Sequence, residues 1–488
     1  MKCFFSCSQE ASNYQSSVEL TQHLIMEKFR WFLEKSGIDF KQHQYDGVAW
    51  CIQNETNIEP IHKIRGGFIA DDMGLGKTIT MIATFILHYL PRTLIILPNI
   101  LIEQWRTEIL RTTGHKVLIY HGAAKKKITL LQLKQAHIVI ATYGAITIPK
   151  KKLTPDRKRE DLSLLHQVEW GRVVFDEGHH LRNKTSRYFG AYALKAKVRW
   201  IVTGTPIQNR IKDFYNLCAV LHMPQSYYAE PDNMKNLIDS FVLKRTKAQA
   251  GITLPPITPQ QETVAWKSDA ERELSKDIHN AINATRAKLK LIIHARQACI
   301  LPSLLQTYIA KLVQTEAIPK IHTQFAPELS SSSKMDAVLD TLIARKDNGH
   351  GKIVFCHYRK EIDTVIERLT TAGVSNVCAF DGRLSQVSRI QKLKEAFSVI
   401  VLQIQTGCEG LNLQHNFSEV YFVSPHWNPA IEDQAIARCH RIGQTKPVSV
   451  FRFKMDQIET PTKPIITLDQ HITDIQKIKR DVAKTILA

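Results

Sequence analysis

The sequence has nine cysteines, but it lacks any C-x-x-C pair among them. Zinc ribbons and RING domains need such closely spaced thiolates, so neither is encoded here. Single cysteines scattered through a chain of this size are typical of a reducing compartment. The cysteine pattern therefore predicts an intracellular protein.

Long apolar runs are missing as well. No run reaches the roughly eighteen apolar residues that a membrane-spanning helix requires. The N-terminal stretch MKCFFSCSQE has too short an apolar run for a signal peptide. We therefore expect a soluble chain without a membrane partner.

Acidic residues are outnumbered by basic ones. Asp and Glu number 46 against 65 Lys and Arg, which gives a net charge of +19 and a pI near 9.4. Such a charge on a folded chain favours a polyanionic partner, with nucleic acid ahead of an acidic membrane. Solubility alone is the alternative explanation.

Strand-length apolar runs occur in two sets, and helix-length amphipathic segments separate them. Near-continuous apolar strands that alternate with helices predict parallel sheets covered on both faces. We therefore expect an α/β fold with two parallel-sheet lobes in tandem. The runs of the first lobe are 66–70, 93–97, 137–143, 172–177 and 198–204, and those of the second are 352–358, 377–382, 399–404, 419–425 and 448–454.

The strand rhythm disappears between roughly residues 210 and 333, where the segment 269–297 has a helical pattern. The proline-rich stretch LPPITP at 254–259 precedes it and is expected to break the chain. The expected domains are an N-terminal extension over 1–35, a first lobe over 36–250, a helical insertion with linker over 251–333, a second lobe over 334–465 and a terminal helix over 466–488.

The first lobe contains DDMGLGKTIT at 71–80, directly after an apolar strand and before a helix. Gly74 and Gly76 allow a tight turn whose N–H groups face phosphate. Lys77 can reach the terminal phosphates and the Thr78 hydroxyl can bind magnesium. The general pattern has glycine where Asp71 stands. The segment predicts an ATP site with Mg²⁺.

A second strand of the first lobe ends in FDEGHH. Asp176 is placed there to hold magnesium through water, and Glu177 to orient or deprotonate the attacking water. An exposed acidic strand end is the simpler alternative. A third strand ends in TGTPIQN, where the hydroxyls of Thr203 and Thr205 can link Glu177 to the neighbouring lobe.

Four further polar side chains complete the predicted nucleotide site. Gln44, in FKQHQYDGVAW, can pair with an adenine edge, although a surface glutamine is the commoner case. The segment EDQAIARCHRIGQ spaces Gln434, Arg438 and Arg441 at i, i+4 and i+7, which share one face of a helix. Both arginines could then reach a γ-phosphate across a cleft as arginine fingers. A solvated basic helix face is the alternative.

From about Phe40 to its C-terminus the chain resembles the ATPase motor of SWI/SNF-type chromatin remodelers, in helicase superfamily two. The resemblance rests on DDMGLGKT, the DEAH-like box DEGH, LRN (181–183), TGTPIQN and HWNPAIEDQAIARCHRIGQ (426–444). The spellings DEGHHLRN and RCHRIGQ are most similar to the branch that carries a RING insert, which this chain lacks. Compact motors of this kind are familiar from large DNA viruses.

This resemblance implies two RecA-like lobes with ATP and Mg²⁺ between them. The family's phosphate loop commonly opens Asp-Glu-Met-Gly, so Asp72, Met73 and Leu75 join the loop residues that hold the nucleotide. It also implies contacts with double-stranded DNA from loops at strand ends. The implied contacts are Gln104 and Trp105 of NILIEQW, Thr142 and Tyr143 of ATYG, Arg383 of DGR, and Gly407 and Gly410 of TGCEGLNL. For Trp105, packing against its own lobe is an equal alternative.

Two other features have alternative interpretations. The lysine-rich tracts at 125–127 and 150–159 could bind further DNA backbone, and the second could instead serve as a nuclear import signal or form a solvated loop. The tail over 467–484 resembles a brace helix that regulates lobe closure, but a helix packed only for stability would have the same pattern.

We hypothesise an ATP-dependent double-stranded DNA translocase with chromatin- or protein–DNA-remodeling output. Nucleosomes or a DNA-bound transcription or repair complex are further candidate partners, and the oligomeric state is not predicted. The expected location is the nucleus, or a cytoplasmic virus factory or virion if the chain is viral. The alternatives are a strand-separating DNA or RNA helicase and a non-hydrolysing DNA-binding scaffold.

Overall fold

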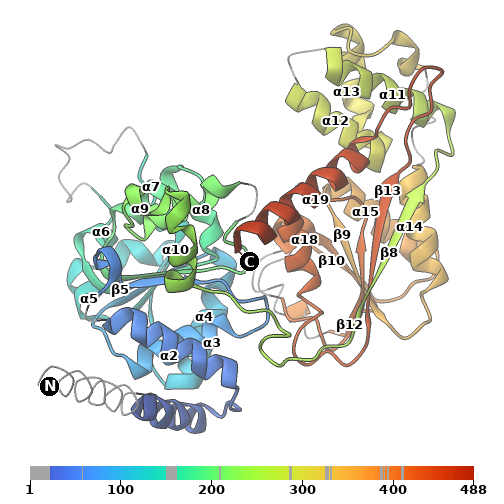
Figure 1. Ribbon diagram of the computed structural model, residues 1–488. Helices are drawn as coiled ribbons and strands as arrows, with labels where there is room; N and C mark the ends of the chain where they lie inside the picture. Colours follow the sequence, from blue (N-terminus) through green and yellow to red (C-terminus); the bar gives the residue numbers. More distant parts are fainter. Residues whose placement is uncertain are drawn as a thin grey trace, which may run out of the picture. The chain divides into compact units, whose positions relative to one another are not determined.

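The computed structural model describes residues 22–57, 59–149, 162–207, 210–284, 288–324, 329, 332–384, 388, 391–392, 395–407 and 411–487. The chain divides into two compact units, one ending at Thr253 and the other spanning Leu254–Thr485. Figure 1 shows the sheet and helices of each unit. The lysine-rich tract at 150–159 lies outside the described residues.

The first unit is built on a parallel sheet of seven strands in the order β3-β4-β2-β5-β6-β1-β7. The strand bounds are β1 Gly66–Ile69, β2 Thr93–Leu97, β3 Leu118–Tyr120, β4 Ile138–Thr142, β5 Glu169–Asp176, β6 Lys195–Val202 and β7 Val242–Leu243. The expected parallel α/β lobe is confirmed. The two strands at the sheet edges, β3 and β7, are short and were not predicted.

Helices cover both faces of this sheet because its central strands are apolar on both sides. In β2, Leu94 and Ile96 pack into one core cluster, and Ile95 and Leu97 pack into the other. One face is covered by α2, α3 and α4, and the opposite face by α7, α8 and α10 (Figure 1). The helix bounds are α2 Gln42–Thr56, α3 Lys77–Leu87, α4 Ile102–Thr113, α5 Leu130–Gln135, α6 Leu164–Gln167, α7 Ser186–Ala193, α8 Ile211–Val220, α9 Gln225–Tyr228 and α10 Met234–Phe241.

The strand order brings three predicted motifs to one edge of the sheet. β6 lies between β5 and β1, and both pairings are parallel. The carboxyl ends of the three strands therefore lie together, and ligands of open α/β sheets bind at this edge. The phosphate loop follows β1, Asp176 ends β5, and the TGTP segment follows β6.

The second unit has a parallel sheet of six strands in the order β10-β11-β9-β12-β13-β8. The strand bounds are β8 Ile257–Val264, β9 Gly351–Cys356, β10 Val377–Phe380, β11 Val399–Gln403, β12 Phe417–Phe422 and β13 Val448–Met455. Its helices are α11 Asp269–Ala284, α12 Lys288–Ile300, α13 Gln306–Gln314, α14 Ser333–Ala344, α15 Arg359–Thr371, α17 Ile404–Gly407, α18 Pro429–Ile436 and α19 Leu468–Leu487.

One part of the expected helical insertion is a strand instead. β8, which overlaps the expected chain break, pairs with β13 along its whole length at the edge of the second sheet. Its side chains from Ile257 to Thr263 are exposed, so the segment has no apolar run to mark it as a strand. Pro259 is tolerated there because an edge strand has unpaired N–H positions.

The remaining insertion is helical and has a core of its own. α11, α12 and α13 pack around Leu274, Ile278, Leu291 and Leu305. The terminal helix α19 adds Leu468 and Ile472 to that cluster. None of the helices in the described part of the chain is long and apolar enough to cross a membrane.

Candidate active site

The phosphate loop of the first unit has the backbone that its sequence predicts. Gly74 and Gly76 have φ angles of 97° and 82°, in the left-handed region, and Gly76 caps the N-terminus of α3. A Cβ atom on Gly76 would lie 2.4 Å from Nε2 of Gln44. Glycine is thus required by both the turn and its neighbour. The loop therefore points the positive end of α3 at whatever occupies it.

Lys77 begins α3, and the loop's own backbone holds its ammonium group. Nζ donates to the carbonyl oxygens of Asp71 at 2.7 Å and Asp72 at 3.1 Å. Burial lowers the pKa of Lys77, and the charge of Glu177 is the main opposing influence. The cation is therefore held by two neutral carbonyl oxygens, and its hydrogen bonds to them are weaker than those it would make to the charged oxygens of a phosphate.

The two carboxylates that open the loop anchor the segment after β7. Asp71 is 1% exposed. Its Oδ1 accepts from the backbone N–H of Arg245 at 3.0 Å and from Nε at 3.1 Å, and Oδ2 accepts from Nη2 at 2.6 Å. Oδ2 of Asp72 accepts from the backbone N–H of Lys247 at 3.3 Å. The pair connects the phosphate loop to residues 244–247, a link that the sequence analysis missed.

Asp176 ends β5 with its carboxylate held on both sides. Oδ2 accepts from the indole N–H of Trp105 at 2.7 Å, and Oδ1 from the backbone N–H of Glu177 at 3.1 Å. Burial raises the pKa of Asp176, and the neighbouring Glu177 raises it further. The acid is fixed in orientation at the strand end, and a nearby cation would favour its ionised form.

Glu177 has a left-handed backbone with φ 49° and ψ 46°, an uncommon conformation for a residue with a Cβ atom. The turn places its Oε2 atom 3.3 Å from Nδ1 of His179. The same Nδ1 lies 3.2 Å from the hydroxyl of Thr203, which also accepts from the backbone N–H of Thr205 at 3.2 Å. Thr203 therefore reaches Glu177 through His179, a residue that the sequence analysis did not assign.

Gln44 lies on α2 beside the phosphate loop and is 5% exposed. Its Oε1 atom is buried and makes no hydrogen bond within the described part of the chain. Buried amide oxygens normally have a donor. The exocyclic amino group of adenine would supply one, so the side chain fits the adenine contact predicted for it.

The donor set suits a magnesium ion held partly by phosphate. Among the residues that the structure describes, no cluster of three or more His, Cys, Asp or Glu could hold a metal alone. Mg²⁺ typically takes one or two protein oxygens together with substrate phosphates and water. Thr78, next to the loop lysine, and the oriented carboxylate of Asp176 provide such oxygens.

The second unit corrects the expected geometry of the arginine segment. We expected Gln434, Arg438 and Arg441 on one helix face, but α18 ends at Ile436 and turns follow. The backbone carbonyl of Arg438 accepts from the N–H of Leu413 at 2.9 Å instead of continuing the helix. The prediction of one shared helical face is therefore wrong, because the helix ends before Arg438 and Arg441.

The two arginines nevertheless form a cationic pair within the second unit. Arg441 donates to the side-chain oxygen of Asn412. Nε of Arg438 is buried and has no hydrogen-bond partner among the described residues. Burial lowers the pKa of Arg441, and the charge of Arg438 lowers it further. An anion bound at the pair would relieve that repulsion. Gln434 is buried on α18.

The predicted DNA contacts of the first unit differ in exposure. Gln104 is exposed, whereas Trp105 is 1% exposed. Thr142 and Tyr143 are buried, and the Tyr143 hydroxyl donates to the backbone carbonyl of Asp176 at 2.7 Å. Of these four residues, only Gln104 presents an open side chain in this structure.

In the second unit, Arg383 is held by two carboxylates. It donates to Asp381 at 2.8 Å and to Asp363 at 2.7 Å, and these hydrogen bonds raise its pKa. A phosphate would have to compete with both acids for this guanidinium. Gly407 is the last residue of α17, and Gly410 lies outside the described residues.

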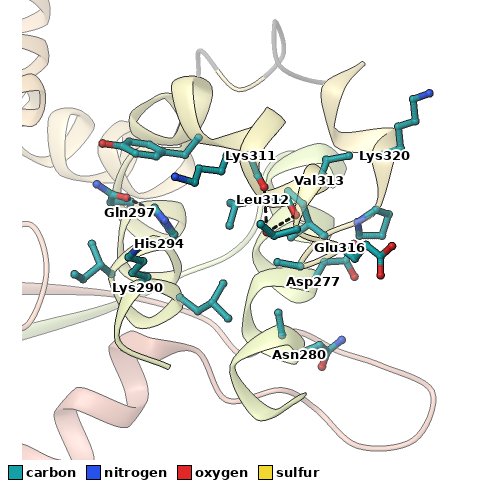
Figure 2. Close-up of a pocket in the computed structure, with 18 residues that line it drawn as sticks. Asp277, Asn280, Lys290, His294, Gln297, Lys311, Leu312, Val313, Glu316 and Lys320 are labelled. Carbon is teal, nitrogen blue, oxygen red and sulfur yellow. Dashed lines mark hydrogen bonds between the residues drawn. The ribbon is translucent and has the colours of Figure 1, made fainter. Parts of the chain in front are cut away.

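A pocket of about 1200 Å³ opens in the helical insertion, and none of its lining residues is a predicted site residue. Figure 2 shows Lys290 and His294 along one side of it and Asp277 and Glu316 along the other. The residues that line the pocket all belong to or follow α11, α12 and α13. The pocket therefore shares no residue with the candidate active site.

Comparison with known proteins matches two family models to this geometry. The SNF2-related domain matches residues 43–232, which include the phosphate loop, Asp176 and Glu177. The helicase conserved C-terminal domain matches residues 333–443, which include the two arginines. The two matches follow the order of the two sheets.

Several known proteins are similar to most of this chain. It is 27% identical over 458 residues to the probable global transactivator of Orgyia pseudotsugata multicapsid polyhedrosis virus, covering 85% of this chain and 86% of the other. The identity to the ATP-dependent DNA helicase DDM1 of Arabidopsis thaliana is 26% over 486 residues. This match covers 87% of this chain and 60% of DDM1. The identity to the DNA excision repair protein ERCC-6-like of Danio rerio is 24% over 508 residues. This match covers 84% of this chain and 34% of the Danio protein. The chain therefore spans most of the viral relative but only about a third of the Danio protein.

Among solved structures, the chain is similar to the Sulfolobus solfataricus SWI2/SNF2 ATPase core in complex with dsDNA. The identity is 23%, the match covers 92% of this chain and 93% of the other, and the TM-score is 0.39.

Proposed function

The chain belongs to the SWI2/SNF2-type ATPases, with an SNF2-related domain followed by a helicase C-terminal domain, and we therefore propose that it hydrolyses ATP in order to move along double-stranded DNA. The observation that carries the proposal is the convergence of Lys77, Asp176 and Glu177 at the carboxyl edge of the first sheet. The Lys77 ammonium is held by the carbonyl oxygens of Asp71 and Asp72, the charges of Glu177 and Asp176 act to raise its pKa, and Asp176 is held by two hydrogen bonds.

The residues of the first unit divide the work of binding and hydrolysis. The α3 N-terminus and Lys77 bind the phosphates, and Lys77 must leave the carbonyl oxygens of Asp71 and Asp72 to do so. Gln44 binds the adenine edge. Thr78 and Asp176 would hold Mg²⁺, which would supply positive charge beside the phosphate oxygens. Glu177 orients the attacking water and accepts its proton, with His179 and Thr203 behind it.

Arg438 and Arg441 are proposed to stabilise the charge that develops on the γ-phosphate. Their mutual repulsion and the unpartnered Nε of Arg438 support the binding of an anion. Gln434 would contact the nucleotide from the same unit. Because these groups and Lys77 come from different units, hydrolysis would require the units to close together and would thus be coupled to motion.

The DNA track is proposed to be bound through its phosphates, with little dependence on base sequence. The net charge of +19 supports this partner. Gln104, Thr142, Arg383 and Gly407 remain candidate contacts. Repeated closure would move the motor without separating the strands, and the output would be the displacement or remodeling of DNA-bound proteins, nucleosomes included. Such work would take place in a nucleus, or in a virus factory or virion.

The test measures ATP turnover in parallel with duplex DNA, single-stranded DNA, RNA and nucleosomes. We expect duplex DNA, naked or in nucleosomes, to stimulate turnover most. Lys77→Ala should abolish turnover, whereas Lys134→Ala, at an exposed lysine of α5, should leave it intact. Unchanged turnover in Lys77→Ala would contradict the assignment of the ATP site. Stronger stimulation by RNA or single-stranded DNA than by duplex DNA would contradict the proposed duplex substrate.

A strand-separating helicase is the competing function within the same superfamily, and a second assay discriminates it. A translocase displaces the third strand of a triplex without unwinding a tailed duplex. We expect triplex displacement that depends on ATP and on Glu177. Unwinding of the tailed duplex at a comparable rate would favour the helicase instead.

A further inference from the structure

Trp105 occupies an unusual position for a residue of a predicted DNA-contact segment. It lies on the first turn of α4 and is 1% exposed, within the core cluster that contains Ile95 and Val174. Its indole N–H donates to Oδ2 of Asp176 at 2.7 Å across a separation of 71 residues. The ring is therefore turned away from solvent and toward the acid that ends β5.

The chemistry of this contact suits orientation. An indole N–H is a donor only, and it neither titrates nor accepts a proton. With the Glu177 N–H on Oδ1 and the indole on Oδ2, one donor holds each carboxylate oxygen of Asp176. Each oxygen keeps a further lone pair for a cation or for the water of its coordination shell. The two donors thus fix the orientation of the carboxylate and leave both of its oxygens able to bind a cation.

The neighbour of Trp105 in the chain faces the other way. Gln104 is exposed on the same first turn of α4. A ligand that moves this turn would also move the indole, because both side chains leave adjacent backbone positions of one helix. A rigid element that carries one residue into each environment is a physical connection between the two.

We propose that Trp105 is a positioning residue for Asp176, and that through α4 it connects the magnesium end of the nucleotide site to the DNA-facing turn that carries Gln104. This inference rests on the proposed function. It assigns Trp105 a role inside the protein in place of the DNA contact that the family resemblance implies. Partners that orient metal ligands typically change metal affinity or activity by about 10- to 100-fold when they are removed.

Trp105→Phe tests the positioning role because it keeps an aromatic ring and removes the N–H. ADP binding is measured by calorimetry on the full chain, in EDTA and over a Mg²⁺ titration. We expect unchanged ADP affinity in EDTA and a Mg²⁺ requirement raised by about tenfold or more. Replacing Trp105 by 3-benzothienylalanine, which keeps the shape of the indole and lacks only the N–H, should have the same effect.

Trp170→Phe is the matched control. Trp170 is also 1% exposed in the first unit, and its indole N–H donates at 2.9 Å to a backbone carbonyl, that of Leu165. Its substitution removes a buried indole hydrogen bond without touching Asp176, so the Mg²⁺ requirement should stay at the wild-type value. An equal change in both variants would mean that loss of packing explains the effect.

The connection to DNA is tested by the ratio of turnover with duplex DNA to turnover without it. Trp105→Phe should lower this ratio while leaving duplex affinity unchanged. A wild-type Mg²⁺ requirement in both Trp105 variants would overturn the positioning role. A raised requirement with full duplex stimulation would overturn the connection to α4. If the wild-type chain itself bound no nucleotide, the proposed function would fail instead.

Discussion

At the scale of single residues, the contact between Asp71 and Arg245 separates this phosphate loop from the general pattern. The aspartate that replaces the first glycine is buried and receives three donors from one arginine. Breaking a buried ion pair from one side leaves an uncompensated charge and typically costs about 3–5 kcal/mol. The loop thus depends on a residue that follows it by 174 positions.

We expect Arg245→Ala to lower the free energy of unfolding of the first unit by about 3 kcal/mol or more, because Asp71 would remain buried without its partner. Urea denaturation of the full chain measures the loss. Arg480→Ala is the control, since its bridge to Asp433 has side chains 43% and 40% exposed and should be worth about 1 kcal/mol or less. Equal losses in the two variants would contradict the prediction.

Glu361 provides a residue-scale prediction about pH. It is fully buried in the second unit, and burial raises its pKa to about 7, although the backbone N–H groups of His357 and Tyr358 favour the charged form. A raised folded-state pKa means that the unfolded chain releases the proton first, so stability falls as pH rises from about 4.5 to about 7. This pKa shift corresponds to a loss of roughly 3 kcal/mol in the free energy of unfolding.

Glu361→Gln should remove this loss, which chemical denaturation at pH 5 and pH 7.5 would detect. The neighbouring His357 has the opposite effect, because burial lowers its pKa and its stability contribution disappears as pH falls below about 6.5. The comparison is therefore made between variant and wild type at each pH. A variant with the same pH dependence as the wild type would show that Glu361 does not titrate in this range.

Residue by residue, the sequence predicted best where the chemistry is local. Gly74, Gly76 and Lys77 lie within four positions, and their spacing alone specifies a phosphate loop. The partners of Asp176 and Glu177 could not be predicted in the same way. Trp105 meets Asp176 across 71 positions, and only the pairing of strands and helices brings them together.

At the scale of elements, α19 is tied to α18 through a buried carboxylate. Glu432 has no exposed surface and accepts from the backbone of His426 at 2.9 Å, from Arg452 at 3.0 Å and from Gln476 of α19 at 2.6 Å. Two residues later α18 carries Gln434. The terminal helix therefore helps to orient the element that leads to the predicted arginine fingers.

We expect Gln476→Ala to cost about 1–3 kcal/mol in the stability of the second unit, because Glu432 loses a donor. If α19 is a brace, ATP turnover of the folded variant should also fall while ADP affinity stays unchanged. Lys477→Ala is the control on the same helix, since the Lys477 side chain is exposed. Lower stability with normal turnover would assign α19 a packing role only.

Strands could be predicted from the sequence where both of their faces are buried. A strand such as β2, with the sequence TLIIL, is buried throughout and stands out as an apolar run. β8 does not, because seven of its eight side chains are exposed and only its pairing with β13 makes it a strand. α18 was predicted too long, since it ends at Ile436 and the carbonyl of Arg438 accepts from the distant N–H of Leu413.

At the scale of the whole molecule, the excess of basic residues predicts how DNA binding depends on salt. Neutralising about six to ten phosphates releases counterions and should lower duplex affinity by roughly 10³- to 10⁵-fold between about 50 and 200 mM salt. Fluorescence anisotropy with two duplexes of unrelated sequence measures both slope and specificity. We expect equal slopes for the two duplexes. An affinity independent of salt would mean that the charge of +19 serves solubility alone.

The backbone of Glu177 has a consequence for engineering. A left-handed conformation costs a residue with a side chain roughly 1–2 kcal/mol relative to glycine. Glu177→Gly should therefore make the first unit more resistant to heat while removing the carboxylate that activates water. A library screened for thermal stability alone would enrich inactive variants with glycine at position 177. A selection for a more heat-stable enzyme therefore has to include ATP turnover as a second criterion.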